Sequence, residues 1–273
     1  MIIGMFDSGV GGLSVLRALR WQLPAQPILY LADQAHVPYG PRPLEEVRAF
    51  SVEITRFLLR QGARCIVVAC NTASAAALHH LRATFPDVPF VGMEPAVKPA
   101  AESTHSGVVG VLATPATFQG ELYASVVERF ASGVTLLQDT CPGLVGQIEA
   151  GDLNGPRTRA ILAAALNPML AQGMDTVVMG CTHYPFVIPL IQEITGTGVR
   201  VIDPAPAVAR QTGRVLAARG WLAPPGPPAP VRFFTTGQAE PFAGQIARLL
   251  DGELPPLASD MIEVVHWKDQ HLE

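Results

Sequence analysis

The sequence contains almost no lysine. Lys98 and Lys268 are its only lysines among 19 cationic residues, and arginine supplies the rest. A lysine Schiff base is therefore a weak explanation for any chemistry that the chain performs. The glycine-rich stretch GVGG at residues 9–12 also lacks the lysine that completes a phosphate-binding P-loop, so it does not predict a nucleotide site.

Cysteine is scarce as well. The four cysteines lie at positions 65, 70, 141 and 181 and form no CxxC pair. We expect free thiols in a reducing compartment rather than disulfides. Two of the cysteines and one histidine are zinc-type ligands, but their spacing matches no recognised zinc pattern and predicts no metal site.

Long apolar runs and targeting signals are also missing. No uninterrupted apolar run reaches the length of a membrane span, and the N-terminal stretch MIIGMFDSG lacks the cationic segment of a signal peptide. Charged residues make up 15% of the chain, the net charge is −4, and no basic stripe is present. This composition argues against nucleic acid as the primary ligand and predicts a soluble protein of the cytoplasm that does not contact membranes.

The residues that are present indicate an α/β protein. Of the 273 residues, 49% are hydrophobic, which allows a large buried core. Short apolar runs such as RCIVVAC (64–70) and DTVVMGC (175–181) alternate with amphipathic stretches. In residues 45–61 apolar side chains recur at helical spacing, and Gly62 is a natural helix end. Alternating strands and helices predict mainly parallel sheets flanked by helices.

The chain is internally duplicated in its pattern. The stretch IIGMFDS at 2–8 is similar to VVGVLAT at 108–114, and each is followed at equal distance by an aspartate and at nearly equal distance by a cysteine that ends an apolar run. The corresponding residues are Gly4 and Gly110, Asp33 and Asp139, and Cys70 and Cys181. Three matching strand ends in the same order favour two similar domains over chance.

We therefore predict two pseudo-symmetric domains. The first comprises residues 1–97 plus 208–273, and the second comprises residues 98–207. The proline-rich stretch WLAPPGPPAP at 221–230 is predicted to be a surface connection. Beyond it, VRFFTTG and MIEVVHW are predicted to be two further strands that complete the first domain.

Polar side chains gather where the predicted strands end, which is where open parallel sheets bind ligands. The set is Asp7, Ser8, Cys70, Asn71, Thr72, Thr114, Cys181, Thr182 and His183. A single cysteine at such a place is more often a small buried hydrophobe, and we assign Cys65 and Cys141 to that class. If the two domains face each other, however, Cys70 and Cys181 lie on opposite walls of one cleft.

The surroundings of these two cysteines suggest a chemistry. Cys70 is followed by Asn-Thr and Cys181 by Thr-His, so hydroxyl, amide and backbone N–H groups accompany each thiol. Such groups suit a small ligand that carries carboxylates. Two acid/base groups that face one substrate from opposite sides suit a reaction on both faces of one carbon, and racemisation is such a reaction.

Seven motifs carry a resemblance to a known family. They are FDSGVGG (6–12), PYGPR (38–42), VVACNTAS (67–74), GMEPAVKPA (92–100), CPGLVGQIEAG (141–151), GCTHYP (180–185) and IDPA (202–205). In order and over nearly the whole chain, they resemble the glutamate racemases of the aspartate/glutamate racemase family.

The resemblance implies a fold and a mechanism. It implies two α/β domains with the active site in the cleft between them, and an isomerase that supplies D-glutamate for peptidoglycan without a cofactor or metal. Cys70 would exchange the α-proton of D-glutamate, and Cys181 that of L-glutamate. Asp7 would assist the first thiol, and His183 and Glu149 the second.

The resemblance also assigns the residues that bind glutamate, the one partner that it implies. They are Asp7, Ser8, Tyr39, Gly40, Asn71, Thr72, Thr114, Thr117, Thr182 and His183, with Thr114 and Thr117 as ligands of the side-chain carboxylate. A homodimer is left open.

Three other functions stay open at this point. The substrate could be aspartate or another small amino acid with the same chemistry. The chain could be a binding or regulatory protein that keeps the fold without catalysis. It could also be a thiol hydrolase that uses cysteine and histidine, which requires an acyl-enzyme.

Overall fold

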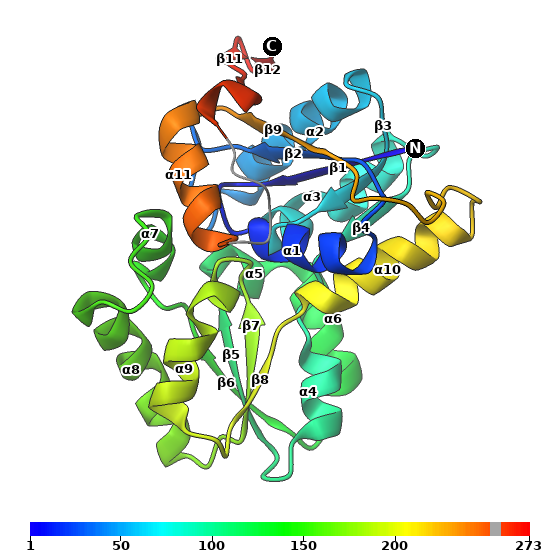
Figure 1. Cartoon of the computed structure of the whole chain (residues 1–273). Helices are drawn as coiled ribbons and strands as arrows, with labels where there is room; N and C mark the ends of the chain where they lie inside the picture. Colours follow the sequence, from blue (N-terminus) through cyan, green and yellow to red (C-terminus); the bar gives the residue numbers. More distant parts are fainter. Residues whose placement is uncertain (252–257) are drawn as a thin grey trace.

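Two parallel sheets form two lobes of the chain, as Figure 1 shows in a computed structural model that describes residues 1–251 and 258–273. The first lobe contains a six-stranded sheet in the order β10-β9-β2-β1-β3-β4. Its strands are β1 (Ile2–Asp7), β2 (Ile28–Ala32), β3 (Ala63–Val68), β4 (Phe90–Gly92), β9 (Val231–Thr235) and β10 (Ile262–Val264).

The second lobe contains a four-stranded sheet in the order β6-β5-β7-β8. Its strands are β5 (Val108–Ala113), β6 (Thr135–Asp139), β7 (Thr176–Gly180) and β8 (Arg200–Ile202). Every strand pair in both sheets is parallel. The predicted α/β class with mainly parallel sheets is confirmed.

Helices flank both sheets (Figure 1). In the first lobe they are α1 (Leu13–Gln22), α2 (Leu44–Arg60), α3 (Asn71–Thr84) and α11 (Ala239–Leu249). In the second lobe they are α4 (Val97–Ser103), α5 (Pro115–Gln119), α6 (Glu121–Phe130), α7 (Leu144–Glu149), α8 (Pro156–Ala171), α9 (Ile188–Thr195) and the 3-10 turn η1 (Tyr184–Val187). Helix α10 (Ala205–Ala217) leaves the second lobe and packs on α1, so it links the two.

The duplication predicted from the sequence is visible in the sheet order. Strands β2-β1-β3-β4 of the first sheet correspond one by one to β6-β5-β7-β8 of the second. The two cysteines follow equivalent strands, because Cys70 comes after β3 and Cys181 after β7. Strands β9 and β10 extend only the first sheet, beside β2.

The predictions for the C-terminal part of the chain and for the domain boundaries have different outcomes. Residues 221–230 contain no helix or strand, as predicted for a surface connection. The two further strands predicted for the first domain are present as β9 and β10, but β10 ends at Val264, and Trp267 starts a separate antiparallel hairpin, formed by β11 (Trp267–Lys268) and β12 (His271–Leu272). The domain boundaries at 97/98 and 207/208 stay a prediction. The first falls in the first turn of α4, and the second falls in the first turn of α10.

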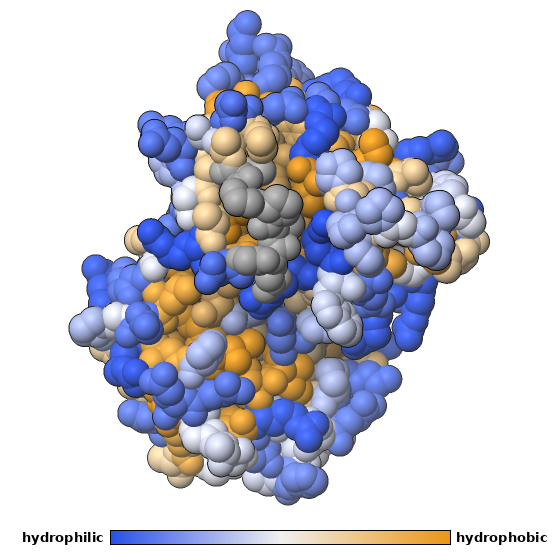
Figure 2. Space-filling model, in the orientation of Figure 1, coloured by the Kyte–Doolittle hydropathy of each residue, from blue (hydrophilic) through white to orange (hydrophobic). Residues whose placement is uncertain are grey.

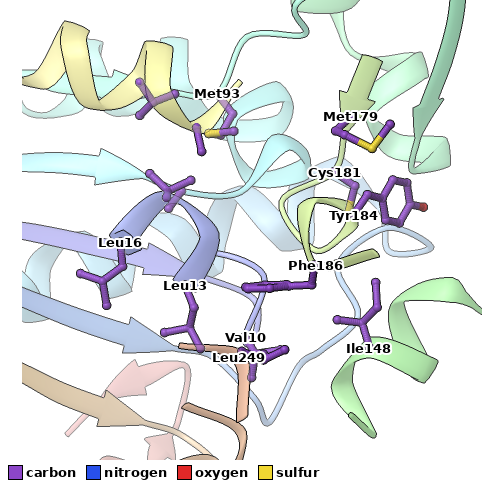
Figure 3. Packing of buried hydrophobic residues seen from close by; sticks show 14 of the residues in the cluster. Val10, Leu13, Leu16, Met93, Ile148, Met179, Cys181, Tyr184, Phe186 and Leu249 are labelled. Carbon is purple, nitrogen blue, oxygen red and sulfur yellow. The ribbon is translucent and has the colours of Figure 1, made fainter. Parts of the chain in front are cut away.

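A hydrophobic cluster joins the lobes on one side of the molecule. It combines residues of both sheets with residues of α1, α7 and α11. Figure 3 shows Phe186 of η1 in this cluster, near Val10 and Leu13 of the first lobe and Ile148 of the second. The lobes are therefore held together by apolar contacts as well as by the chain crossings.

Within the described residues, no helix is long and apolar enough to cross a membrane.

The central strand of each sheet carries a glycine where helices or neighbouring strands come very close. A Cβ on Gly4 would lie 2.9 Å from the Cβ of Ala63 and 3.2 Å from that of Leu58 on α2. A Cβ on Gly110 would lie 2.4 Å from the sulfur of Met174. The aligned glycines thus serve the same purpose, which is close packing against the central strand.

Gly4→Val should lower the free energy of unfolding by about 1–3 kcal/mol, since the new side chain overpacks β1 against α2 and β3. Urea unfolding followed by circular dichroism measures the change. The matched control is Gly244→Ala in α11, where a Cβ meets nothing within 4 Å and alanine favours the helix. A Gly4→Val protein as stable as the wild type would contradict this account of the packing.

Candidate active site

The carboxyl ends of β1, β3, β5 and β7 meet between the lobes and enclose one small cavity. The residues that line it are Ser8, Pro38, Tyr39, Gly40, Cys70, Asn71, Thr72, Thr114, Val145, Cys181, Thr182 and His183. Both cysteines contribute to its wall, one from each lobe, and each is only 5% exposed. The cavity has a volume of ≈ 20 Å³, which is room for about one water molecule.

Cys70 begins helix α3. Its sulfur accepts a hydrogen bond from the backbone N–H of Ala73 at 3.4 Å, so the thiol lies at the positive end of the helix dipole. Burial nevertheless raises the pKa of Cys70 well above its usual value, and the charge of Asp7 raises it further. The N–H groups of Ala73 and Ser8 oppose this rise. The surroundings of Cys70 therefore favour its thiol form.

Asp7 is the acid beside Cys70. Its side chain is fully buried at the end of β1. One carboxylate oxygen accepts from the N–H of Gly9 at 2.9 Å, and the other accepts from the hydroxyl of Thr182 in the second lobe at 3.2 Å. Burial raises the pKa of Asp7 above its usual value, while His183 lowers it. A buried carboxyl with a raised pKa can accept and return a proton.

A histidine and a glutamate accompany Cys181. The Nδ1 atom of His183 lies 3.8 Å from the sulfur of Cys181, and its Nε2 lies 2.6 Å from Oε1 of Glu149. Burial alone would lower the pKa of His183, but the hydrogen bonds to Cys181 and Glu149 outweigh it and hold this pKa well above its usual value. An imidazole at this distance from Cys181 can exchange a proton with that side chain.

The glycine-rich loop after β1 receives these side chains from the second lobe. A Cβ on Gly9 would lie 2.0 Å from Oε1 of Glu149, and a Cβ on Gly11 would lie 2.4 Å from Nδ1 of His183. The N–H of Val10 donates to Oε1 of Glu149 at 2.9 Å. The loop GVGG at residues 9–12 is therefore the surface of the first lobe that contacts Glu149 and His183, the two residues that accompany Cys181.

A chain of hydroxyl groups crosses from one lobe to the other. The hydroxyl oxygen of Thr72 lies 2.8 Å from that of Thr114, which lies 3.0 Å from that of Thr117. A Cβ on Gly40 would lie 2.9 Å from the Cβ of Thr114, so glycine is needed for this close approach. Thr117 reaches the cavity only through Thr114, because it is not part of the cavity wall.

Asn71 is the clearest candidate for a ligand-binding side chain. Both polar atoms of its side chain are buried and have no hydrogen-bond partner, and the residue lines the cavity. A buried amide without partners costs free energy, and such groups are usually satisfied. An amide offers two N–H donors and one acceptor oxygen, which suits a ligand that carries both a carboxylate and an ammonium group.

The structure brings all the predicted site residues together. Ten of the thirteen line the cavity, and the other three each hydrogen-bond to a residue that does: Asp7 to Thr182, Thr117 to Thr114 and Glu149 to His183. Sequence reasoning missed the N–H of Val10, and it also missed Ser14, whose hydroxyl lies 2.9 Å from the carbonyl oxygen of Thr182. Within the described residues, no group of three or more His, Cys, Asp or Glu is arranged to hold a metal ion.

The sequence matches the family model of Asp/Glu/hydantoin racemases over residues 4–212. The chain belongs to this racemase family. It is 55% identical to the glutamate racemase of Pseudomonas aeruginosa over 238 residues, which covers 87% of this chain and 89% of the relative. Members of the family are racemases, so the chain is an isomerase.

Solved structures of family members share the fold. Glutamate racemase isoform RacE1 from Bacillus anthracis is 32% identical with a TM-score of 0.86, and the match covers 99% of this chain and 98% of that one. Escherichia coli glutamate racemase in complex with L-glutamate and the activator UDP-MurNAc-Ala is 32% identical with a TM-score of 0.82, and the match covers 97% and 98%. The family resemblance predicted from the motifs is confirmed.

Replacing Glu149 by glutamine should lower the pKa of His183, since the variant loses the charge and the acceptor that favour the imidazolium. A histidine whose pKa is raised by folding stabilises the fold fully below its unfolded value of about 6.5, and this contribution is lost as the pH rises through the folded pKa. Glu149→Gln should therefore destabilise the protein more at pH 6 than at pH 10. NMR titration of the histidine Cε1–H signals and urea unfolding at both pH values measure the two effects.

The control for this experiment is Glu53→Gln. Glu53 pairs with His271 at 3.3 Å, and neither residue lines the active-site cavity. The substitution Glu53→Gln should leave the titration of His183 unchanged. An unchanged pKa of His183 in Glu149→Gln would show that the pair does not couple as described.

Proposed function

We propose that the chain is a glutamate racemase that interconverts L- and D-glutamate by a two-thiol mechanism without a cofactor. The observation that carries this proposal is the pair Cys70 and Cys181 in the wall of one cavity, one from each lobe. The names of the relatives support glutamate as the substrate, and one related structure contains L-glutamate. The site supplies a proton carrier on each side of a bound α-carbon.

The polar groups of the cavity suit glutamate. Within the described residues, no lysine or arginine lines the cavity, so carboxylates would be bound by neutral donors and by the N-terminus of α3. Asn71 and Ser8 are assigned to the α-amino acid end of the substrate. The hydroxyls of Thr72 and Thr114 are assigned to the side-chain carboxylate, and Thr117 acts through its hydrogen bond to Thr114.

The cavity is too small for glutamate in this closed arrangement. Its volume is ≈ 20 Å³, which is room for about one water molecule, whereas glutamate has about ten non-hydrogen atoms. The lobes or the cavity loops must therefore separate to admit the substrate. Closure afterwards excludes water and strengthens the electrostatic interactions around the α-carbon.

The reaction requires one thiolate and one thiol at the start. From L-glutamate, the Cys181 thiolate takes the α-hydrogen as a proton, and the electron pair of the C–H bond stays on the substrate. The Cys70 thiol then donates its proton to the opposite face, which gives D-glutamate, a Cys181 thiol and a Cys70 thiolate. The reverse reaction from D-glutamate exchanges the two roles.

The unequal neighbours of the thiols fit these roles. His183, held by Glu149, can exchange a proton with Cys181, while the raised pKa of Cys70 keeps that residue a proton donor. Asp7 can take the proton of Cys70 when D-glutamate is the substrate. The α-ammonium of the substrate adds positive charge beside both sulfurs and favours thiolate formation.

The biological role is also a proposal. D-glutamate produced by this reaction would supply peptidoglycan synthesis, as the family resemblance implies. The cytoplasmic location and the homodimer stay predictions. Figure 2 shows hydrophobic residues gathered on one face of the second lobe, which is a candidate contact surface for a second copy of the chain.

Purified protein should convert L-glutamate to D-glutamate under reducing conditions without an added cofactor, as measured by chiral chromatography. Cys70→Ser and Cys181→Ser should each lower kcat by at least about 100-fold, because each removes a general acid or base. Cys65→Ala is the control, since Cys65 is buried in β3 away from the cavity wall. Undiminished turnover in either serine variant would refute two-thiol catalysis, and an acyl-enzyme found by mass spectrometry would indicate a hydrolase instead.

Aspartate should be a poorer substrate than glutamate, with kcat/KM lower by about 10–200-fold, since it is one methylene shorter and cannot reach the threonine hydroxyls in the same pose. Parallel assays with both amino acids measure the ratio. Thr114→Val should reduce the preference for glutamate. A higher kcat/KM for aspartate would reassign the substrate while leaving the chemistry intact.

A further inference from the structure

Asp33, at the end of β2, is a fully buried carboxylate that four side chains contact at once. Its Oδ2 accepts from the phenol of Tyr39 at 2.6 Å and lies 2.9 Å from Nδ1 of His36. Its Oδ1 accepts from the hydroxyl of Thr236 and from the indole N–H of Trp267, both at 2.8 Å. Tyr39 is the one member of this group that lines the active-site cavity.

Trp267 comes from the far end of the chain. It begins the C-terminal hairpin β11–β12, which Figure 1 shows at the end of the first lobe that lies away from the second. The hairpin is fixed to the lobe, because Leu272 is fully buried and its carbonyl accepts from Arg60 at 2.8 Å. His266 and Glu273 close the hairpin with two backbone hydrogen bonds. The indole is therefore held in place when it donates to Asp33.

Ring packing provides a second connection between Trp267 and Tyr39. The ring of Phe50 on α2 lies 5.4 Å from that of Trp267 and 5.8 Å from that of Tyr39, measured between centroids. His36 stacks on the same phenylalanine at 3.9 Å and meets the indole edge-on at 5.1 Å. Tyr39 is thus held on its hydroxyl by Asp33 and on its ring by Phe50, and Trp267 contacts both of these residues.

We propose that Trp267 is a positioning residue for substrate binding: from the C-terminal hairpin it fixes Asp33 and Phe50, and through them it sets the place of Tyr39 in the cavity wall. The inference rests on the proposed function, because the family resemblance assigns Tyr39 to glutamate binding and Tyr39 lines the cavity that is proposed to bind it. Trp267 does not itself line the cavity. The C-terminal hairpin thereby becomes part of the binding machinery without contact to substrate.

Trp267→Phe tests this proposal, since it removes the N–H donor and keeps a ring beside Phe50. The KM for both enantiomers of glutamate should rise by about five- to ten-fold while kcat changes by less than about two-fold, because Tyr39 binds ground state and transition state alike. In Tyr39→Phe the donor to Asp33 is gone, so adding Trp267→Phe should raise KM no further. If the KM of the double variant rises by the product of the two single-variant fold-changes, the two residues act independently, and the proposed coupling is overturned.

Two further proteins control for structure. Trp21→Phe makes the same substitution at a side chain that is 88% exposed, and its KM should match that of the wild type. If Trp267→Phe proves unstable in urea unfolding, β-(3-benzothienyl)alanine placed at position 267 replaces the indole N–H by sulfur and keeps the shape. A wild-type KM in that protein would overturn the proposal.

A readout without substrate separates this proposal from the assignment of the reaction. The chain has four tyrosines, so 3-fluorotyrosine labelling gives four ¹⁹F resonances, of which Tyr39→Phe identifies one. Trp267→Phe should shift that resonance, and Trp21→Phe should not. If the wild type fails to racemise glutamate, the proposed function fails, and the fluorine resonance still decides whether the hairpin positions Tyr39.

Discussion

The contact between the glycine-rich loop after β1 and the side chains of Glu149 and His183 is the constraint on which the site depends. Two thiols can act on opposite faces of one carbon only if the two sheets are fixed relative to each other. Gly9 and Gly11 leave space for the carboxylate and the imidazole of the other lobe, and the N–H of Val10 binds that carboxylate. A Cβ at Gly9 would overlap the carboxylate of Glu149, and a Cβ at Gly11 would overlap the imidazole of His183, so either would displace the groups beside Cys181.

The duplicated fold places the two thiols at equivalent positions, but the residues around them differ. Equivalent strands deliver Cys70 and Cys181 to equivalent places, but the first thiol has a buried aspartate as its neighbour and the second has a histidine and a glutamate. Equal surroundings would give the two thiols the same proton affinity. Unequal surroundings favour one thiolate and one thiol, which is the state from which a two-base reaction can start.

Much of the fold and the composition of the site followed from the sequence for a physical reason. Parallel strands present their carboxyl ends at one edge, so residues that follow apolar runs, such as Asn71 and Thr182, had to gather there. Long-range pairing left weaker signals. The hydrogen bond from Val10 to Glu149 joins residues 139 positions apart, and no local pattern in GVGG predicts which segment packs against it.

The sequence predicted the last strand of the first sheet but not where it ends or the hairpin that follows it. MIEVVHW has the composition of a single strand, but Trp267 leaves the sheet to donate to Asp33, and tertiary contacts overrode the local pattern. Likewise, no sequence feature indicated that the cavity would be nearly closed, because its volume depends on how two separately folded lobes meet.

The central claim, that two thiols act on opposite faces of the α-carbon, is tested most directly by deuterium incorporation. L-Glutamate is converted in D₂O, the reaction is stopped early, and both enantiomers are analysed by mass spectrometry. The account predicts that D-glutamate carries deuterium at the α-carbon in nearly every molecule while the remaining L-glutamate keeps its hydrogen, since the group that donates is not the group that abstracts. D-Glutamate that retains the original hydrogen would show one base serving both faces and would contradict the account.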